Sequence, residues 1–472
     1  MQTATAHEFS FIPAETLAGL IRSRELSPVE LMEATLGRID AVNPRLNAFV
    51  QLDAEGAMAR ARSQTERLAH GADLGPLGGL PLGVKELENA AGFRTTNGSR
   101  AFQDRWAERD DIHVERLKAA GAICLGKTNS PEFGYTAFTS NEVFGTTRNP
   151  WNLERTPGGS SGGASAAIAG GLVPLATASD GAGSIRIPAC FVGAYGLKPT
   201  FGLVPIGPRE MLSWIDTSCY GPLTRTVRDA ALYLDQVAGY HPADPTSYPR
   251  PPYSYLERLA EPLPKLRIAF NRLLRSVHVQ RDVLREVEQA AMVFQSLGHE
   301  VEENDDEIEN MVLHWAEMGR FQALAQMEDL VLHHRDRFSP AYAAGFQDVE
   351  QIGARRFGET YRLHARLNDW PWRFFERYDL LLTPTMPLEA FAAEGPIPAD
   401  VEGIPLGAGV AAATATFNFT GHPAANVRAG FTDSGLPAGL QIVGRRHEDA
   451  LVLRASYAYE QARPWNDRWP EL

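Results

Sequence analysis

The apolar positions in the first part of the chain follow a helical period in some segments and form short runs in others. They recur every three or four positions in residues 14–23, and a Ser-Pro-Val-Glu capping box at residues 27–30 begins a second amphipathic pattern. Short apolar runs at residues 47–52 and 80–86 predict strands, and residues 54–70 predict another helix. The alternation of the two patterns is typical of an α/β chain.

Residues 155–200 contain two glycine-flanked serines, Ser160 and Ser184, with small and aliphatic residues between them. Glycine permits tight turns and leaves backbone N–H groups uncovered, so such loops can direct several amides at one oxyanion. We expect a short helix that ends at residues 170–171 and a strand over residues 172–178, which together return the chain to its starting loop. A flexible Gly/Ser linker has similar glycine content, but a linker does not need the apolar residues that recur here: Ile168, Leu172, Val173, Leu175, Ile185 and Ile187.

Composition is ordinary for a globular protein, with 44% hydrophobic and 22% charged residues in a chain of 472. No charge block, repeat or Pro/Ser tract divides the chain, so we expect one domain over residues 1–472, with a helix-rich, substrate-facing region at about residues 280–380. The net charge of −13 disfavours nucleic acid as a partner, because phosphate binding needs clustered cations.

Neither a targeting segment nor a membrane anchor is evident. Residues 1–25 lack the apolar stretch of a signal peptide, and no segment has the roughly 18 consecutive apolar residues of a membrane span. Three widely spaced cysteines suggest neither a disulfide framework nor a zinc site. We therefore expect a cytoplasmic protein with reduced thiols, no metal, no cofactor and no membrane partner.

The chain has only five lysines, and Lys85 stands at the C-terminal end of the apolar run over residues 80–86. From periodicity alone, Lys85 would be a lysine at the edge of the core, with its ammonium group reaching water. Lys118 and Lys265 are expected at the surface.

Three motifs together resemble the amidase signature family: Pro-Gly-Gly-Ser-Ser-Gly-Gly from residue 157, Ser-Asp-x-x-Gly-Ser-Ile-Arg-Ile-Pro from residue 179, and Gly-Leu-Lys-Pro-Thr from residue 196. The resemblance extends over about residues 14–460. It implies an α/β fold with a large mixed, mostly parallel β-sheet covered by helices on both faces. It also implies cleavage of amides, and sometimes esters or carbamates, by a Ser, cis-Ser, Lys triad.

The family's functional residues map onto this chain as follows. Ser184 would attack the carbonyl, Ser160 would relay the proton to neutral Lys85, and the peptide bond before Ser160 would be cis. The oxyanion would be held by the backbone N–H groups of Gly181, Ala182, Gly183 and Ser184.

One departure from the family pattern qualifies that resemblance. The commoner family pattern is Thr-Asp-Thr-Gly-Gly-Ser, whereas this chain has Ala182 beside the proposed oxyanion site, which requires a negative φ or backbone strain there. The Ser-Asp-Gly-Ala-Gly-Ser sequence of this chain at residues 179–184 resembles that of bacterial hydrolases that act on aryl amides, nylon-type oligomers and urethanes. We expect Asp180 and Arg186 to brace the glycine loop.

The candidate substrate-binding residues are Tyr135, Met211 and Trp214. The last two lie in residues 205–220, which form either a mobile lid over the site or an ordinary surface loop with an aromatic anchor. The substrate would be a small-molecule amide, ester or carbamate, and the protein would act as a monomer or homodimer.

Three other interpretations are considered. Gly-x-Ser-x-Gly occurs around Ser160 and Ser161, and with Asp379 and His422 it would suggest an α/β-hydrolase, but that motif needs a strand directly before the serine. An amidotransferase A subunit, similar to that of the glutamyl-tRNA enzyme, shares the triad and works in a complex; it usually has glutamine where this chain has Ile187. A scaffold without catalysis is disfavoured, because all three triad positions are filled.

Overall fold

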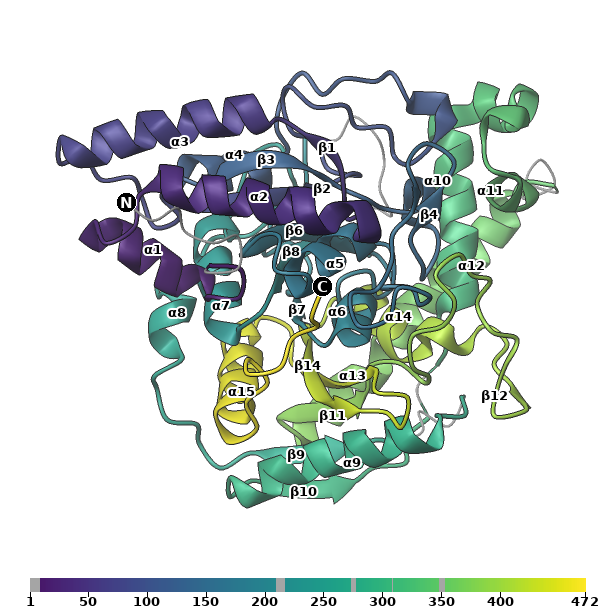
Figure 1. Ribbon diagram of the computed structural model, residues 1–472. Coiled ribbons are helices and arrows are strands. Elements are labelled where there is room, and N and C mark those ends of the chain that lie inside the picture. The colour runs from purple at the N-terminus through teal and green to yellow at the C-terminus, as the bar shows by residue number, and fades with distance from the viewer. Residues whose placement is uncertain (1–8, 209–216, 273–276, 308, 348–352) are drawn as a thin grey trace.

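The computed structural model describes residues 9–208, 217–272, 277–307, 309–347 and 353–472. Eleven of the described strands form one sheet through the middle of the molecule (Figure 1). In spatial order its strands are β1 (Phe49–Leu52), β3 (Ile123–Thr128), β2 (Pro81–Lys85), β6 (Leu175–Asp180), β8 (Cys219–Thr224), β7 (Tyr195–Lys198), β14 (Ala424–Phe431), β15 (Pro437–Gly444), β11 (Leu380–Pro384), β9 (Arg267–Phe270) and β10 (Glu300–Glu303). Two small ribbons lie outside it: β4 (Ser140–Asn141) with β5 (Gly145–Thr146), and β12 (Asp400–Val401) with β13 (Ile404–Pro405).

The sheet is mixed, as predicted, but the expectation that most strands would be parallel is wrong. Six of its ten neighbouring pairs are antiparallel, and the four parallel pairs lie toward the two edges, at β3-β2-β6 and β11-β9-β10. A short turn joins β14 directly to β15 and makes that pair antiparallel, as hairpin connections do. Most of the other antiparallel pairs, such as β6 with β8 and β7 with β14, join strands that are not consecutive in the chain. The α/β pattern of the sequence reveals the crossovers but not which strands become neighbours.

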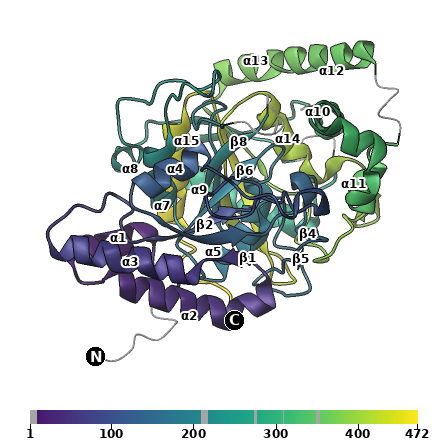
Figure 2. The ribbon, with the colours of Figure 1, turned by 90° about the horizontal axis from the view of Figure 1, so that it is seen from above.

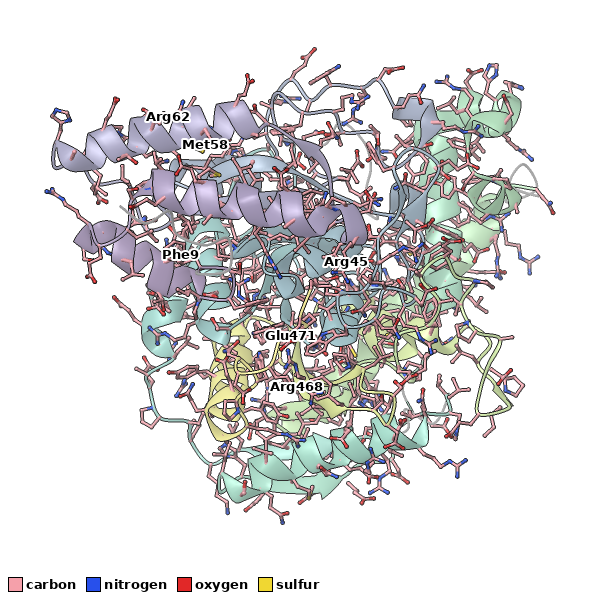
Figure 3. All side chains as sticks on the ribbon, viewed as in Figure 1. Phe9, Arg45, Met58, Arg62, Arg468 and Glu471 are labelled. Carbon is pink, nitrogen blue, oxygen red and sulfur yellow. The ribbon has the colours of Figure 1, made fainter. Side chains whose placement is uncertain are left out.

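Helices cover both faces of the sheet. On one face the largest apolar core includes residues of α1 (Ala14–Ser23), α4 (Ile112–Ala119), α7 (Val227–Val237), α9 (Arg281–Ser296) and α15 (Asp449–Ala462). On the other face a second core joins the sheet to α2 (Pro28–Leu46), α3 (Ala54–Ala69) and α5 (Gly162–Ala169), and smaller clusters join it to α6 (Arg186–Val192) and α14 (Ala412–Phe419). Side chains fill the space between these layers (Figure 3).

The remaining helices lie mostly to one side of the sheet, where α10, α11 and α12 are close together in both views (Figures 1 and 2). Their bounds are α8 (Tyr255–Arg258), α10 (Val312–His333), α11 (Pro340–Ala344), α12 (Ala354–Leu367) and α13 (Asp369–Arg377), with short 3-10 turns at η1 (Arg100–Phe102), η2 (Glu132–Gly134), η3 (Arg335–Arg337) and η5 (Gly409–Ala411). Among the described residues no helix combines the length and apolar character needed to cross a membrane.

Several elements agree closely with the sequence pattern. Helix α1 has the predicted bounds, and the capping box before α2 is formed, with the Ser27 side chain accepting from the Glu30 N–H. Helix α2 continues through Pro44 to Leu46. The strand expected at residues 172–178 is β6, which begins at Leu175 and ends at Asp180. The end of the strand therefore positions Asp180, next to the glycine loop.

Candidate active site

Lys85 is the last residue of β2, a strand whose residues are all buried. Its Nζ lies 2.9 Å from Ser160 Oγ, 3.0 Å from Ser179 Oγ and 3.2 Å from the Ser179 carbonyl oxygen. A neutral amine has two N–H donors and one lone pair. It can therefore donate to both oxygens of Ser179 while it accepts the Ser160 hydroxyl proton.

The Lys85 side chain is completely buried, with no exposed surface. Burial lowers the pKa of Lys85 to about 8, because water no longer stabilises the ammonium form, and the nearby carboxylates of Glu88 and Asp180 oppose this shift. The lysine is not the water-exposed edge residue that periodicity alone allowed. By contrast, Lys265 is exposed as expected and pairs with Glu300 at 2.6 Å.

Ser160 occupies a tight turn before α5. The Gly159–Ser160 peptide bond is cis, as the family resemblance implied. A side chain at Gly159 would lie 2.4 Å from the Thr136 carbonyl oxygen, so the neighbouring segment approaches too closely for any other residue. The loop of Ser160 also contacts the second serine loop, because the Ser161 N–H donates to the Ser184 carbonyl oxygen at 3.2 Å.

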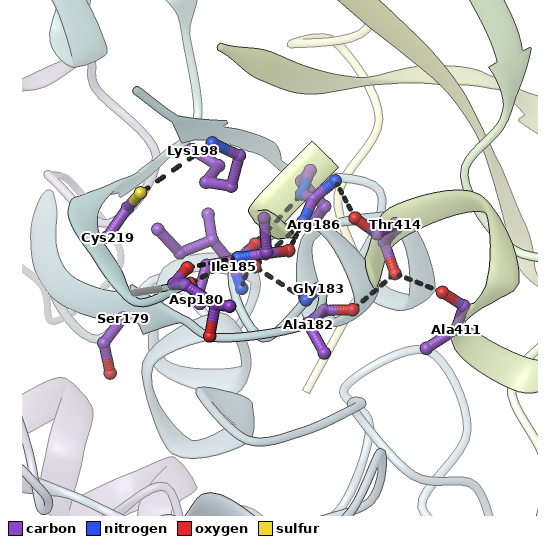
Figure 4. A network of polar contacts seen from close by, with 12 residues as sticks. Ser179, Asp180, Ala182, Gly183, Ile185, Arg186, Lys198, Cys219, Ala411 and Thr414 are labelled. Carbon is purple, nitrogen blue, oxygen red and sulfur yellow. Dashed lines mark hydrogen bonds and ion pairs between the residues drawn. The ribbon is translucent and has the colours of Figure 1, made fainter. Parts of the chain in front are cut away.

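The second glycine loop, residues 181–185, is held by a buried ion pair at its ends (Figure 4). Arg186 Nε lies 3.0 Å from Asp180 Oδ2 and Arg186 Nη2 lies 2.9 Å from Asp180 Oδ1, and neither side chain is exposed. Although burial acts in the opposite direction, Arg186 and the other donors lower the pKa of Asp180 to about 2. Asp180 is therefore a structural anion that stays ionised throughout the working pH range.

Helix α14, more than two hundred residues further along, completes this brace. Asn418 Nδ2 donates to the Asp180 carbonyl oxygen at 2.6 Å, and its Oδ1 accepts from Arg186 Nη2 at 2.6 Å. The Thr414 hydroxyl donates to the Ala182 carbonyl oxygen at 2.6 Å (Figure 4). No motif in the sequence singles out Asn418 or Thr414, whereas Ser179 stands inside the signature motif.

One of the four predicted oxyanion donors needs correction. The Gly183 N–H donates to Asp180 Oδ1 at 2.6 Å and is thus occupied in bracing the loop. Among the described residues, the N–H groups of Gly181, Ala182 and Ser184 have no such partner. The φ of Ala182 is not positive, so its methyl group introduces no backbone strain.

Ser184 is the most exposed residue of this loop, since it is half-buried while Gly181, Ala182 and Gly183 are buried. Gly183 has a φ of +133°, and a side chain there would lie 2.4 Å from Thr414 Oγ1. Glycine is therefore required next to the half-buried serine.

An apolar wall stands beside the loop. Ala182 shares a cluster with Met311, Trp315 and Met318 from the start of α10, and Tyr135 packs against it with its ring stacked on Trp315 at 5.6 Å. Tyr135 is thus close to the glycine loop, and its role in substrate binding stays a prediction. Met211 and Trp214, with the rest of residues 209–216, lie outside the described residues.

The α/β-hydrolase alternative does not fit this geometry. Residues 147–160, all of which are described, contain turns and isolated bridges but no strand before the serines. His422 is buried against Phe375 with ring centroids 5.1 Å apart, and burial lowers its pKa to about 3. Asp379 pairs with Arg445 at 3.1 Å. These two residues have structural partners of their own.

The described residues contain no group of three or more His, Cys, Asp or Glu side chains that could hold a metal ion.

Comparison with known proteins identifies the family. The amidase family model matches residues 30–453. The acylamidase of Rhodococcus erythropolis is 37% identical, and the match covers 99% of this chain and 98% of that protein. The A subunit of the glutamyl-tRNA(Gln) amidotransferase of Carboxydothermus hydrogenoformans is 34% identical over 98% of this chain and 100% of its own length.

Solved structures agree with this result. A bacterial aryl acylamidase of the amidase signature family superimposes with a TM-score of 0.90 at 33% identity, covering 97% of both chains. The 6-aminohexanoate cyclic dimer hydrolase, solved with its substrate, gives a TM-score of 0.88 at 30% identity, covering 98% of this chain and 99% of the other. The predicted resemblance is confirmed, and the chain belongs to the amidase signature family of amide-hydrolysing enzymes.

Proposed function

We propose that the protein hydrolyses the C–N bond of amides through a covalent acyl-enzyme on Ser184. The observation that carries this proposal is the 2.9 Å contact between Lys85 Nζ and Ser160 Oγ at a site where the lysine is fully buried. A buried amine with a lowered pKa can lose its proton near neutral pH and then act as a base.

Each proton has a defined place in the proposed cycle. The Ser184 hydroxyl passes its proton to Ser160 Oγ as it attacks the carbonyl carbon, and the Ser160 proton moves to Lys85 Nζ. When the tetrahedral intermediate collapses, the same relay returns a proton to the leaving amine, and the C–N bond breaks. Water then attacks the acyl-enzyme by the same route and releases the acid and free Ser184.

The negative charge on the carbonyl oxygen would be stabilised by the N–H groups of Gly181, Ala182 and Ser184. These are the loop amides that Asp180 does not occupy. The buried Asp180–Arg186 pair keeps the loop rigid, so the amides need not reorganise during the reaction.

The substrate class we propose is an amide or carbamate with an aromatic or otherwise apolar substituent. Ala182 packs against the apolar side chains at the start of α10, so a substrate carbonyl in the proposed oxyanion site would place one substituent beside Trp315 and Tyr135. An aryl acylamidase and a nylon-oligomer hydrolase among the similar structures support the same class. Carbamates and esters present the same carbonyl chemistry, so urethane cleavage and an esterase side activity belong to the proposal.

The second candidate is an amidotransferase A subunit that acts in a complex. Several curated relatives at 33% to 35% identity have that name. Turnover of a simple anilide by the isolated chain favours the independent hydrolase, whereas activity only with partner subunits favours the amidotransferase.

For its setting we propose the cytoplasm and a monomer or homodimer. Three free, buried cysteines, Cys124, Cys190 and Cys219, suit a reducing compartment.

The decisive experiment compares the wild type with Ser184→Ala on matched p-nitroanilide, aryl ester and aryl carbamate substrates. The wild type should release product from at least the anilide or the carbamate, and trapping at Ser184 should be visible as an acyl adduct by mass spectrometry. Ser184→Ala should show neither turnover nor adduct. Retained turnover in that variant would reject Ser184 as the nucleophile.

The substrate class is tested separately with Trp315→Ala. Loss of the aromatic wall should raise KM for bulky aryl substrates by about tenfold, while a small acetyl substrate changes less. Trp372→Ala is a matched control, since that tryptophan is 63% exposed on α13. An equal effect of Trp315→Ala on small and bulky substrates would remove the support for an apolar subsite.

A further inference from the structure

Glu88 is a fully buried carboxylate close to Lys85, outside the predicted triad and glycine loop. The chain turns at the end of β2, where the Glu88 N–H donates to the Lys85 carbonyl oxygen at 3.0 Å. The Glu88 side chain has no exposed surface. A buried carboxylate is retained only where partners compensate for the lost hydration, so its partners indicate what it does.

The direct partner of the Glu88 side chain is His113 on α4. His113 Nε2 lies 3.0 Å from Glu88 Oε2, and neither side chain is exposed. His113 Nδ1 is buried without a partner among the described residues, and the ring packs against Tyr220 at 4.2 Å. His113 thus fixes the carboxylate in place.

Two carboxylates act on the Lys85 amine, and they differ in their surroundings. Both Glu88 and Asp180 raise the pKa of Lys85 against the larger effect of burial, and Glu88 has the greater influence. Asp180 is neutralised by two hydrogen bonds from Arg186. The pKa of Glu88 is itself lowered: burial raises it, but His113 and, after it, Lys85 act in the opposite direction and outweigh burial, so the interaction with Lys85 is mutual. The other charged or titratable groups that act electrostatically with Glu88 are Asp111, Lys127 and Tyr233.

We propose that Glu88 is a positioning residue for the catalytic base: its buried carboxylate, held by His113, keeps the Lys85 amine basic enough to take and return the Ser160 proton. The inference rests on the proposed function. Desolvation alone would produce an amine that is neutral but a weak base, and proton transfer is most efficient when the base titrates near the working pH. The negative charge of Glu88 makes the Lys85 amine a stronger base again, and the Glu88 side chain does so without contacting the substrate.

The test is the pH dependence of kcat/KM for Glu88→Gln, measured on an activated anilide. Removal of the negative charge should move the acid limb of the profile down by about one pH unit, and the plateau at high pH should fall because Lys85 is a weaker base. Glu88→Asp retains the charge, so its acid limb should stay near that of the wild type. A purely structural role would lower the plateau and leave the limb in place, and that result would overturn the proposal.

Two further variants keep the test decisive. If Glu88→Gln does not fold, Glu88→Met with His113→Leu replaces the pair by apolar residues without leaving an unsatisfied partner, and the same downward shift is expected. Asp111→Asn is the matched control. Asp111 interacts electrostatically with both Glu88 and His113, and burial raises the pKa of its carboxyl to about 6. It is not among the groups that act on Lys85. Its acid limb should coincide with that of the wild type.

The two proposals fail in different ways. The proposed function requires that Lys85→Ala abolish the wild-type limb at the Lys85 pKa of about 8, with at most a partial gain of activity at higher pH. If the acid limb depends on Lys85 but does not move in Glu88→Gln or in the double variant, the role of Glu88 is overturned. The proposed function then still stands.

Discussion

At the scale of single residues, the proposed chemistry depends on how one amine is surrounded. Lys85 Nζ has three oxygen neighbours and no contact with solvent, which is the environment of a proton acceptor and not that of a surface cation. The other buried lysines serve a different purpose: Lys127 Nζ donates to the carbonyl oxygens of Glu86 and Glu88, and Lys198 Nζ donates to that of Pro199 at 2.9 Å. Among these buried lysines, Lys85 is the one that contacts Ser160.

The first prediction at this scale concerns pH. Only neutral Lys85 can accept a proton, so kcat/KM should rise with pH and level off above the Lys85 pKa of about 8. A pH–rate profile of the wild type measures this directly. A profile that is flat between pH 6 and 9 would mean that another group is the base.

The second prediction concerns the identity of the base. Lys85→Arg retains a positive side chain that cannot become neutral, so activity should fall by about 10²–10⁴-fold at every pH. Lys85→Ala should also lose most of its activity but recover part of it at high pH. Lys118→Arg is the control, because Lys118 is a partly exposed lysine that pairs with Asp110 at 2.6 Å. Comparable losses in the Lys118 and Lys85 variants would contradict the assignment.

At the scale of elements, the glycine loop depends on a helix that is distant in sequence. Helix α14 presents Thr414 (Figure 4) and Asn418 to the loop after β6, and Asn418 contacts both Asp180 and Arg186. The loop can therefore hold its unoccupied amides in one orientation only while α14 is packed in place.

Asn418→Ala should expose this dependence. The substitution leaves the Asp180 carbonyl oxygen without that donor, so the free energy of unfolding should fall by about 1–3 kcal/mol and kcat by about 10- to 100-fold, with a smaller change in KM. Thr416→Ala on the same helix is the control, since Thr416 Oγ1 donates to the Glu309 carbonyl oxygen at 2.8 Å and not to the loop. It should lose stability but retain kcat, and an equal loss of kcat in both variants would reject the specific brace.

At the scale of the whole molecule, the two faces of the sheet have different roles. One face carries the large apolar core beneath α7, α9 and α15, and the glycine loop packs toward the clusters of the other face. The buried Glu460 side chain on α15 accepts from the Val227 N–H at the start of α7 at 3.3 Å, which links two helices of the first face. Stability and catalysis can therefore be altered separately.

Glu460 provides a test of that separation. Burial raises the pKa of Glu460 from its ordinary value of 4.5 to about 8. The folded state thus favours the protonated form, and this contribution to stability is complete below about pH 4.5 and is lost as the pH rises through 8. Glu460→Gln cannot ionise, so its Tm should exceed that of the wild type by a few degrees at pH 8 and by much less at pH 5, with kcat unchanged. Calorimetry at the two pH values measures this, and a gain independent of pH would show that Glu460 is not titrating.

Much of this architecture could be predicted from local pattern. The capping box at Ser27, the bounds of α1, and the helix and strand between the two serine loops depend on neighbouring residues, which the sequence displays directly. Local pattern could not predict which strands of the sheet run parallel and which antiparallel. Pairs such as β7 with β14 join segments more than two hundred residues apart. The sequence also could not show that the Gly183 N–H, predicted as an oxyanion donor, is bound to Asp180. Whether that N–H can reach an oxyanion depends on where the folded chain places the Asp180 carboxylate.

The sequence by itself determined the family and the three side chains proposed for the chemistry, because the signature motifs are contiguous and their residue types are the reactive groups themselves. Only the tertiary structure decided that Lys85 is fully buried and in contact with Ser160, that Asn418 braces the loop, and that the carboxylate at the turn after Lys85, Glu88, is buried against His113. The physical reason is that burial and electrostatic coupling depend on through-space distance, which is set by the packing of segments far apart along the chain.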